Sequence, residues 1–350
     1  MLRDGREAVG EASPSPVYGA ALLMRFGSQA HREFKSPRLR PDFRRTIPRV
    51  ELSLADGLTT RPPRRDDLPA LHRLIAAYEQ RLLGEPLVDL EDLEADWQRP
   101  SFDPARDALL VLDGDALVGA ADAHTPSRSD VVVHPGAWGR GIGSALLDWT
   151  LRTASKRGAA RVGQTVPDAD TAAAAPLRSR GGEPLWTSWV LELPPGEQVP
   201  PRPLPPGYRL RPYLPERDER AAYDVVEQAF AQWPDREPTS FEDWRATVTQ
   251  RPGFAPWQLL LVEGADGQRV GVCHVLLSDG TGWVNQLAVD RDHRGRGIAQ
   301  ALLAEAYTAA RERGARRSEL STDSRTGALD LYEGLGMRVR WSFTHWTAAG

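Results

Sequence analysis

Two stretches of the sequence, 156 residues apart, are versions of one another and decide the fold. Residues 140–161 read RGIGSALLDWTLRTASKRGAAR and residues 296–317 read RGIAQALLAEAYTAARERGARR, with 11 of 22 positions identical and no gap. Self-similarity at one fixed offset indicates a repeated structural unit, and this offset is far too long for a solenoid repeat. The sequence therefore predicts a duplicated domain.

The boundaries of the two copies follow from composition. Between them, residues 194–207 read PPGEQVPPRPLPPG, half of it proline, which favours an extended, semi-rigid spacer over a packed element. We expect a first domain over 58–193, a linker over 194–206 and a second domain over 207–350. Residues 1–57 have scattered prolines and no sustained hydrophobic period, so we expect a disordered N-terminal extension there.

Each copy has the same order of expected elements. A short strand leads into helical stretches, then hairpin strands, then a strand that ends in a glycine-rich turn and a long amphipathic helix, expected over 143–156 and 299–313. Gly158 and Gly314 follow those helices as stop signals. A further strand, a short helix and a final strand close each copy. The expected fold class is α/β (α+β), with two tandem domains, each a mixed, mostly antiparallel sheet flanked by helices.

Composition excludes several classes of protein. With 41% hydrophobic and 26% charged residues, the 350-residue chain can form packed cores. A net charge of −4 and a pI near 6.0 argue against a basic nucleic-acid-binding surface. The single cysteine, Cys273, rules out an internal disulfide and a cysteine-rich zinc site, and no apolar run reaches the roughly 20 residues that span a bilayer. We expect a cytoplasmic monomer or homodimer that binds no metal, nucleic acid or membrane.

The glycine-rich turn of the second copy, His293-Arg-Gly-Arg-Gly-Ile-Ala299, lies between an expected strand and an expected helix. It is not a P-loop, because no Gly-Lys-Ser/Thr ends it. It is not a dinucleotide fingerprint, because the third glycine is missing and the preceding hairpins are not a βαβ unit. The remaining interpretation is an anion cradle, in which backbone N–H groups converge at the positive end of a helix.

Two motifs identify the resemblance. Residues 289–303, VDRDHRGRGIAQALL, resemble the acyl-CoA-binding motif Q/R-x-x-G-x-G/A of the Gcn5-related N-acetyltransferase (GNAT) superfamily, with Arg294, Gly297 and Ala299 at its defined positions. Residues 328–337, ALDLYEGLGM, are similar to that family's A-x-x-x-Y-x-x-x-G-F segment. The resemblance covers about 58–193 and 207–348, in the tandem arrangement of two-domain actinobacterial members. It implies transfer of an acetyl group from acetyl-CoA to a primary amine of a small molecule or peptide.

The resemblance also implies roles for particular residues of the second copy. The phenol of Tyr332 is expected to act as the general acid toward the departing sulfur. Met337 replaces the usual aromatic residue, and Arg325 stands where the family often has an asparagine. The coenzyme's pantetheine arm and pyrophosphate are expected to bind the main chain of two runs of residues: Leu287, Ala288 and Val289 on the strand, and Arg294, Gly295, Arg296, Gly297, Ile298 and Ala299 in the turn.

The sequence leaves the general base open. An alkyl ammonium with a pKa of about 10.4 must lose a proton before attack, at a cost of about 4.6 kcal/mol at pH 7. Members of the superfamily often have a glutamate on the strand before the anion turn, where this chain has Asn285 and Gln286. Glu227, His274 and Glu319 are candidates by location, and a water chain to a distant carboxylate is an equal alternative.

The first copy departs from the motif at two places. Trp138 stands where the family has Gln or Arg, and the tyrosine position falls on Leu177, which has no proton to donate. Its turn still offers a possible second coenzyme site at Val133, Gly139, Arg140, Gly141, Ile142 and Gly143. Two roles stay open for this copy, coenzyme binding without turnover and a purely structural one. For the whole chain, the alternatives are a non-catalytic acyl-CoA-binding or sensor protein and an acyltransferase that uses another acyl-CoA.

Overall fold

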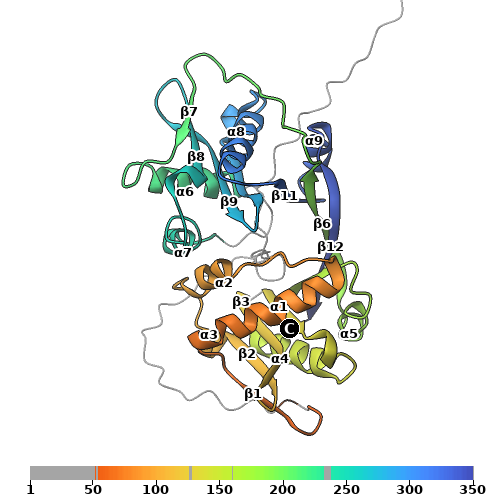
Figure 1. The fold of residues 1–350 in the computed structure, drawn as a ribbon. Helices are drawn as coiled ribbons and strands as arrows, with labels where there is room; N and C mark the ends of the chain where they lie inside the picture. Colours follow the sequence, from red (N-terminus) through yellow and green to blue (C-terminus); the bar gives the residue numbers. More distant parts are fainter. Residues whose placement is uncertain (1–51, 53, 126–127, 160, 232–237, 350) are drawn as a thin grey trace, which may run out of the picture.

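The computed structural model describes residues 52, 54–125, 128–159, 161–231 and 238–349, so most of the expected N-terminal extension lies outside the described residues. The strands of this part of the chain form one 12-stranded sheet in the order β1-β2-β3-β4-β5-β12-β6-β11-β10-β9-β8-β7. Most elements of the first copy lie in one half of the molecule and most elements of the second copy in the other (Figure 1).

The two copies contain the same succession of elements, as the repeat predicts, except that α3 of the first copy has no α-helical counterpart in the second. The first comprises β1 (Leu58–Arg61), α1 (Leu68–Leu83), α2 (Leu90–Trp97), α3 (Pro104–Asp107), β2 (Ala108–Asp113), β3 (Ala116–Thr125), β4 (Arg128–Val133), α4 (Ile142–Lys156), β5 (Arg161–Pro167), α5 (Ala174–Arg178) and β6 (Glu183–Leu193). The second comprises β7 (Arg209–Pro212), α6 (Glu219–Phe230), α7 (Phe241–Thr247), β8 (Leu259–Glu263), β9 (Arg269–Ser278), β10 (Thr281–Val289), α8 (Ile298–Glu312), β11 (Arg317–Asp323), α9 (Leu329–Gly334) and β12 (Arg338–Ala349).

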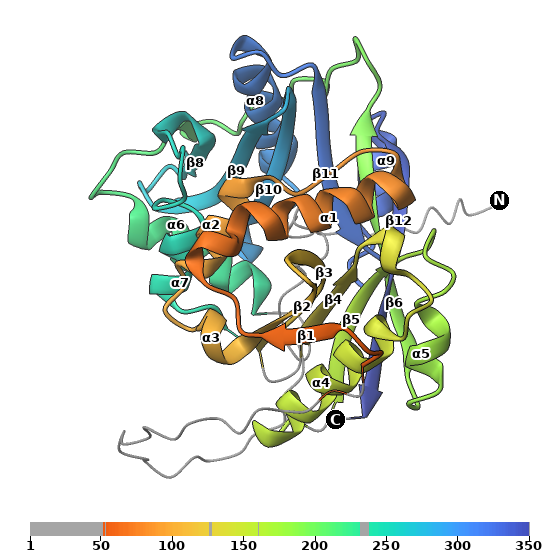
Figure 2. The ribbon, with the colours of Figure 1, turned by 60° about the horizontal axis from the view of Figure 1, so that its bottom comes forward.

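The sheet is mixed and mostly antiparallel, which confirms the expected fold class. Strand pairs β4–β5 and β10–β11 are parallel, and the other described pairs are antiparallel. In each copy, alternate residues of the strands face two different helical layers. Leu287 and Val289 pack with helix α8, whereas Ala288 between them packs with α6 and α7. In the first copy, α4 packs on one face of the strands, and α1 and α2 pack on the other (Figure 2).

The last strands of the two copies are exchanged. β12, at the end of the second copy, pairs with β5 of the first copy, and β6, at the end of the first copy, pairs with β11 of the second. β6 and β12 also pair with each other and run side by side between the two halves (Figure 1). The domain boundaries expected from the sequence describe the order of the chain, but each half of the sheet is completed by a strand of the other copy.

Helices α4 and α8 lie unusually close to the sheet at one glycine each. A methyl group placed on Gly119 would lie 2.8 Å from Cγ2 of Ile142, and one placed on Gly271 would lie 2.8 Å from Cγ2 of Ile298. Both isoleucines are the first residue of their helix. A side chain at either glycine would push the start of the helix away from the strand. The same close approach therefore fixes the position of the glycine-rich turn in both copies.

Candidate active site

Strand β10 separates from its parallel neighbour at the centre of the second copy. It pairs with β9 from Thr281 to Val289, but with β11 only from Thr281 to Val284, and the β9 register shifts between Val284 and Gln286. This shift is a β-bulge at Asn285, a feature that commonly re-aims side chains next to active sites. The main chain of Leu287, Ala288 and Val289, predicted to bind the pantetheine arm, lies on the stretch that no longer pairs with β11.

The predicted anion turn connects this strand to helix α8. Gly295 and Gly297 have φ angles of 72° and 78°, a conformation that glycine adopts without strain, and Gly297 is the residue before the helix. Nε of Arg294 donates a hydrogen bond to the carbonyl of Val289 at 3.1 Å. The Arg294 side chain therefore holds the turn against the end of its own strand. The first N–H groups of α8 have no partner inside the helix, as in sites that bind phosphate.

Tyr332 lies in α9 and is fully buried. It belongs to the same core cluster as Leu287, Ile298 and Met337, so strand, helix start and phenol meet at one place. Burial, with a smaller effect of the neighbouring Cys273, raises the pKa of the phenol well above its usual value. Tyr332 is therefore held in its protonated form, which can donate a hydrogen bond. Met337, a departure from the family pattern, is part of this packing.

The structure distinguishes the three candidate bases. Glu319 on β11 is buried, and Nη1 of Arg340 lies 2.7 Å from its Oε1, so the carboxylate is already paired with a cation. Burial raises its pKa, whereas Arg317 and Arg340 lower it, and the net direction is upward. Glu227 lies half-buried on α6. Neither residue is on the bulged strand or its antiparallel partner.

His274 is the candidate base that lies at the bulge. It is fully buried on β9, directly opposite Gln286, and its Nδ1 is 3.0 Å from Nδ2 of Asn285. Nε1 of Trp244 donates to Oε1 of Gln286 at 3.1 Å, and the ring of Phe254 is centred 6.3 Å from the imidazole. An imidazole, two amides and two aromatic rings thus gather on the α6–α7 face. Sequence reasoning gave Phe254 no role, because it lies in a connection without any motif.

The first copy keeps the geometry of the turn despite its different sequence. Nε1 of Trp138 donates to the carbonyl of Val133 at 2.9 Å, the same bond that Arg294 makes to Val289. Gly139 and Gly141 both have φ of 79°, and a methyl group on either would have no atom within 4 Å. Trp138 therefore substitutes structurally for the expected Arg or Gln. By contrast, Leu177 is buried against Leu147, Val166 and Trp346, in an apolar cluster.

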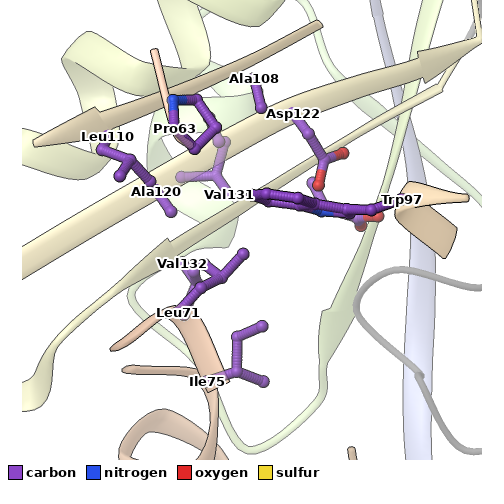
Figure 3. Close-up of a pocket in the computed structure, with 12 residues that line it drawn as sticks. Pro63, Leu71, Ile75, Trp97, Ala108, Leu110, Ala120, Asp122, Val131 and Val132 are labelled. Carbon is purple, nitrogen blue, oxygen red and sulfur yellow. The ribbon is translucent and has the colours of Figure 1, made fainter. Parts of the chain in front are cut away.

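A small cavity of about 20 Å³ lies on the α1–α2 face of the first copy, and its walls include Leu71, Ile75 and Trp97 (Figure 3). Asp122 and Asp130 also line it and are directly opposite each other on β3 and β4. Gly119 lies opposite Val133 in the first copy, as Gly271 lies opposite Val289 in the second. Counted along the strands from these pairs, Asp122 stands at the position of His274, and Asp130 at the position of Gln286. This side of the first copy is therefore acidic where the second has an imidazole and an amide.

Ion pairs and apolar contacts hold the α1–α2 connection of the first copy against the second. Glu85 pairs with Arg317 at 2.6 Å and with Arg340 at 3.1 Å. Leu83 and Leu87 pack in one cluster with Leu276 and Trp283, on the two strands that carry His274 and Asn285. The first copy thus forms part of the surroundings of the second copy's bulge.

The buried side chain of Glu79 binds the main chain at the end of the α1–α2 connection. Its Oε2 accepts hydrogen bonds from the N–H groups of Leu87 at 2.7 Å and Val88 at 3.2 Å, whereas its buried Oε1 has no hydrogen-bond partner among the described residues. Burial raises the pKa of the carboxyl to about 8 against the effect of these two bonds, and Asp92 adds to the rise. Glu79 is therefore mostly protonated at neutral pH.

This pKa predicts a pH-dependent stability. Because the folded pKa lies above the ordinary value of 4.5, the contribution of Glu79 is complete below pH 4.5 and is lost as the pH rises toward 8. Glu79→Gln keeps the acceptor oxygen and cannot ionise. The unfolding free energy of the wild type relative to this variant should fall by about 3 kcal/mol between pH 5.5 and 8. Urea unfolding at several pH values measures it, and parallel curves for the two proteins would contradict the assignment.

Neither metal sites nor membrane spans emerge from the described ranges. No group of three or more His, Cys, Asp or Glu side chains within them could hold a metal ion. No helix of the same ranges is both long and apolar enough to cross a bilayer.

The fold, the splayed strand and the turn define an acyltransferase. The model of the Acetyltransferase (GNAT) family matches residues 68–181 and 219–337, and the chain belongs to this family, with two copies of its domain. It is an acyl-CoA-dependent N-acyltransferase. The resemblance inferred from the two sequence motifs is thereby confirmed.

Two named relatives are similar to this chain over most of its length. A mycothiol acetyltransferase of Thermobispora bispora is 33% identical over 249 residues, which cover 68% of this chain and 80% of the relative. One of Sanguibacter keddieii is 31% identical over 301 residues, 79% of this chain and 91% of the relative. The two family motifs in their tandem arrangement already suggested an architecture similar to that of mycothiol synthase.

Solved structures support the same fold. A GCN5-related N-acetyltransferase from Sphaerobacter thermophilus superposes with a TM-score of 0.68 at 32% identity and covers 85% of this chain and 97% of its own. A tandem GNAT protein from the clavulanic acid biosynthesis pathway gives a TM-score of 0.62 at 20% identity, over 83% of this chain and 98% of its own. The second similarity concerns the fold alone.

Proposed function

We propose that the second copy transfers an acetyl group from acetyl-CoA to the primary amine of a small molecule by direct attack through a tetrahedral intermediate. One observation carries the proposal. The stretch of β10 that leaves β11 shares a core cluster with the start of α8 and with Tyr332. A thioester bound along that strand edge has the anion turn at one end and a phenol at the other.

The main chain positions the donor in this proposal. The N–H groups from Arg294 to Ala299 bind the pyrophosphate, and the strand edge at Leu287, Ala288 and Val289, which does not pair with β11, pairs with the amides of the pantetheine arm. Hydrogen bonds to a charged acceptor contribute roughly 1.5–3 kcal/mol each, so a few of them suffice to anchor the coenzyme. The amine attacks the thioester carbonyl, the tetrahedral intermediate collapses, and the C–S bond breaks with release of the coenzyme as a thiolate.

Tyr332 stabilises this leaving group as a hydrogen-bond donor. The pKa of a thiol is about 8.5 and that of an ordinary phenol about 10, so complete proton transfer to the sulfur is uphill. Burial raises the pKa of Tyr332 further, which makes complete transfer still less favourable. A hydrogen bond from the phenol to the emerging thiolate needs no transfer and grows stronger as negative charge develops on the sulfur.

His274 accepts the proton of the attacking amine in this proposal. It faces the bulge from the α6–α7 face, opposite to the α8 face on which Tyr332 packs, so base and acid approach the thioester from two sides. Nδ2 of Asn285 donates to its Nδ1, so the neutral ring carries its proton on Nε2, and Nδ1 exchanges this hydrogen bond for the proton of the amine. Glu319 is less suited, since its carboxylate already binds Arg340.

The first acceptor to test is mycothiol without its acetyl group, because two relatives more than 30% identical are named mycothiol acetyltransferases. The purified chain is incubated with acetyl-CoA and this amine, other small primary amines or a peptide N-terminus. Thiol release and the mass of the product are then followed. The proposal expects one product 42 Da heavier, the mass of an acetyl group replacing hydrogen, with one free thiol for each product.

Two other outcomes would decide against parts of the proposal. Higher turnover with propionyl-CoA or succinyl-CoA than with acetyl-CoA would change the acyl group but keep the reaction. Binding of acetyl-CoA with no transfer to any amine would contradict the proposed reaction and favour the non-catalytic binding or sensor protein.

A further inference from the structure

We propose that Arg202, from the linker between the two copies, is a phosphate-binding residue of the second copy's coenzyme site. This inference rests on the proposed function, because it assigns a cation to the donor's phosphates. Arg202 lies outside both domain motifs, and in this proposal it binds the same diphosphate as the main chain of the anion turn.

The linker is fixed against the start of helix α8. The side chain of Val199 is buried in the core cluster that contains Ile298. Nε2 of Gln300, in the first turn of α8, donates to the carbonyl of Pro200 at 2.8 Å. The segment between β6 and β7 passes over this helix in Figure 1. The proline-rich segment is therefore packed along the second copy as well as connecting the two domains.

Tyr208 fastens the far end of the same segment to the anion turn. Its hydroxyl oxygen lies 2.8 Å from Nδ1 of His293 and accepts a hydrogen bond from Nη1 of Arg296 at 2.7 Å. Arg202 lies between these attachments. The main chain that carries Arg202 is therefore already fixed before a ligand binds.

Arg202 lies directly over Gly297, the residue immediately before α8. A methyl group on Gly297 would be 2.5 Å from both Cδ and Nε of Arg202. Arg202 itself is exposed, and it makes no hydrogen bond or ion pair with any other residue in the part of the chain that the structure describes. Its guanidinium group is thus available at the position where the pyrophosphate is expected.

The electrostatics of this position favour an anion. A helix N-terminus carries a partial positive charge, so an arginine beside it is unfavourable unless a negative group lies between them. Guanidinium groups form paired hydrogen bonds with phosphate oxygens and are preferred for that purpose. A diphosphate bound to the first N–H groups of α8 would offset the partial positive charge of the helix end and would accept hydrogen bonds from Arg202.

The first copy provides an internal comparison. Gly141 corresponds to Gly297, and a methyl group on it would meet no atom within 4 Å. The arginine of that turn, Arg140, pairs instead with Asp113 at 2.6 Å. The linker thus places a cation on the turn of the copy that keeps the tyrosine, and the turn of the other copy is left open.

The test compares Arg202→Ala with a matched control, Arg209→Ala, in the full-length chain. Arg209 is also an exposed arginine and lies on β7. Calorimetry measures the Kd of acetyl-CoA, and steady-state kinetics separates KM from kcat. We expect Arg202→Ala to weaken acetyl-CoA binding and raise its KM about tenfold with kcat unchanged, whereas Arg209→Ala changes neither. Arg202→Lys should recover part of the loss.

A truncated donor separates phosphate binding from a structural effect. S-acetylpantetheine lacks the diphosphate, so its KM should be the same for the wild type and Arg202→Ala. An equal loss with both donors, an unchanged Kd for acetyl-CoA, or tighter binding by the variant would each overturn the inference. Tighter binding would mean that the side chain obstructs the site. If the wild type itself bound no acetyl-CoA, the proposed function would fail, and the inference with it.

Discussion

Tyr332→Phe is expected to lower kcat by a factor of about 10² to 10⁴ while the Kd of acetyl-CoA changes less than about twofold. The substitution removes one oxygen from a fully buried ring and leaves the packing against Leu287, Ile298 and Met337 in place. The lost hydrogen bond would act mainly in the transition state, where negative charge develops on the sulfur, so the effect should appear in kcat rather than in binding.

Tyr307→Phe is the matched control for this prediction. Tyr307 is the other fully buried tyrosine of the same cluster, and its hydroxyl donates to the carbonyl of Glu319 at 2.9 Å. Its loss should reduce stability by about 1 kcal/mol and leave kcat within a few-fold of the wild type. If the two substitutions lowered kcat equally, Tyr332 would have no specific role in catalysis. If Tyr332→Phe were fully active and Gly141→Glu in soluble, folded protein abolished turnover, the catalytic assignment would belong to the first copy.

The repeat made much of the fold predictable. The starts of α4 and α8 were expected within one residue, because glycine turns, helix periodicity and stop signals are local features. The exchange of β6 and β12 was not predicted. β6 and β12 each follow a short helix near the end of their own copy. The local sequence pattern therefore does not decide whether each strand pairs within its own copy or with the equivalent strand of the other copy.

The site was predictable where it depends on a motif. The turn and Tyr332 were assigned from two motifs that resemble those of the family, whereas the preference for His274 depends on the register of β9 against β10. Trp138 was interpreted as a departure from the motif, yet its indole N–H makes the bond that the guanidinium of Arg294 makes. Arg202 was missed because the composition of the linker indicated a spacer and gave no sign of what it packs against.

Arg251→Ala is expected to reduce the free energy of unfolding by about 3–5 kcal/mol, a large effect for one residue. The Arg251 side chain is only 6% exposed and binds two carboxylates of the first copy, Asp89 at 2.9 Å and Asp92 at 3.1 Å. Burial lowers the pKa of the guanidinium, but the attraction of Asp92 and Asp89 outweighs it, so the pKa is raised. Without the arginine, Asp89 and Asp92 lose the cation that they share in a poorly solvated interface.

This origin of the loss can be tested by neutralising the carboxylates. Adding Asp89→Asn and Asp92→Asn to Arg251→Ala should restore part of the stability, and asparagine at 89 keeps a side chain that can cap α2. Arg161→Ala is the control, since its ion pair with Glu183 is 3.6 Å long and exposed, and it should cost less than about 1 kcal/mol. A loss for Arg251→Ala as small as for the control would show that the interface does not depend on this pair.

The same substitution should also reduce activity, because Arg251 connects the interface to the candidate base. The carbonyl of Arg251 accepts a hydrogen bond from the N–H of Phe254, and the ring of Phe254 packs beside His274. A loosened interface would let this segment move and would widen the site on the side where the amine approaches. We therefore expect Arg251→Ala to raise the KM of the amine more than that of acetyl-CoA, at a temperature where the variant is still folded. An equal rise in both constants would mean that the first copy supports the fold of the second without shaping its acceptor site.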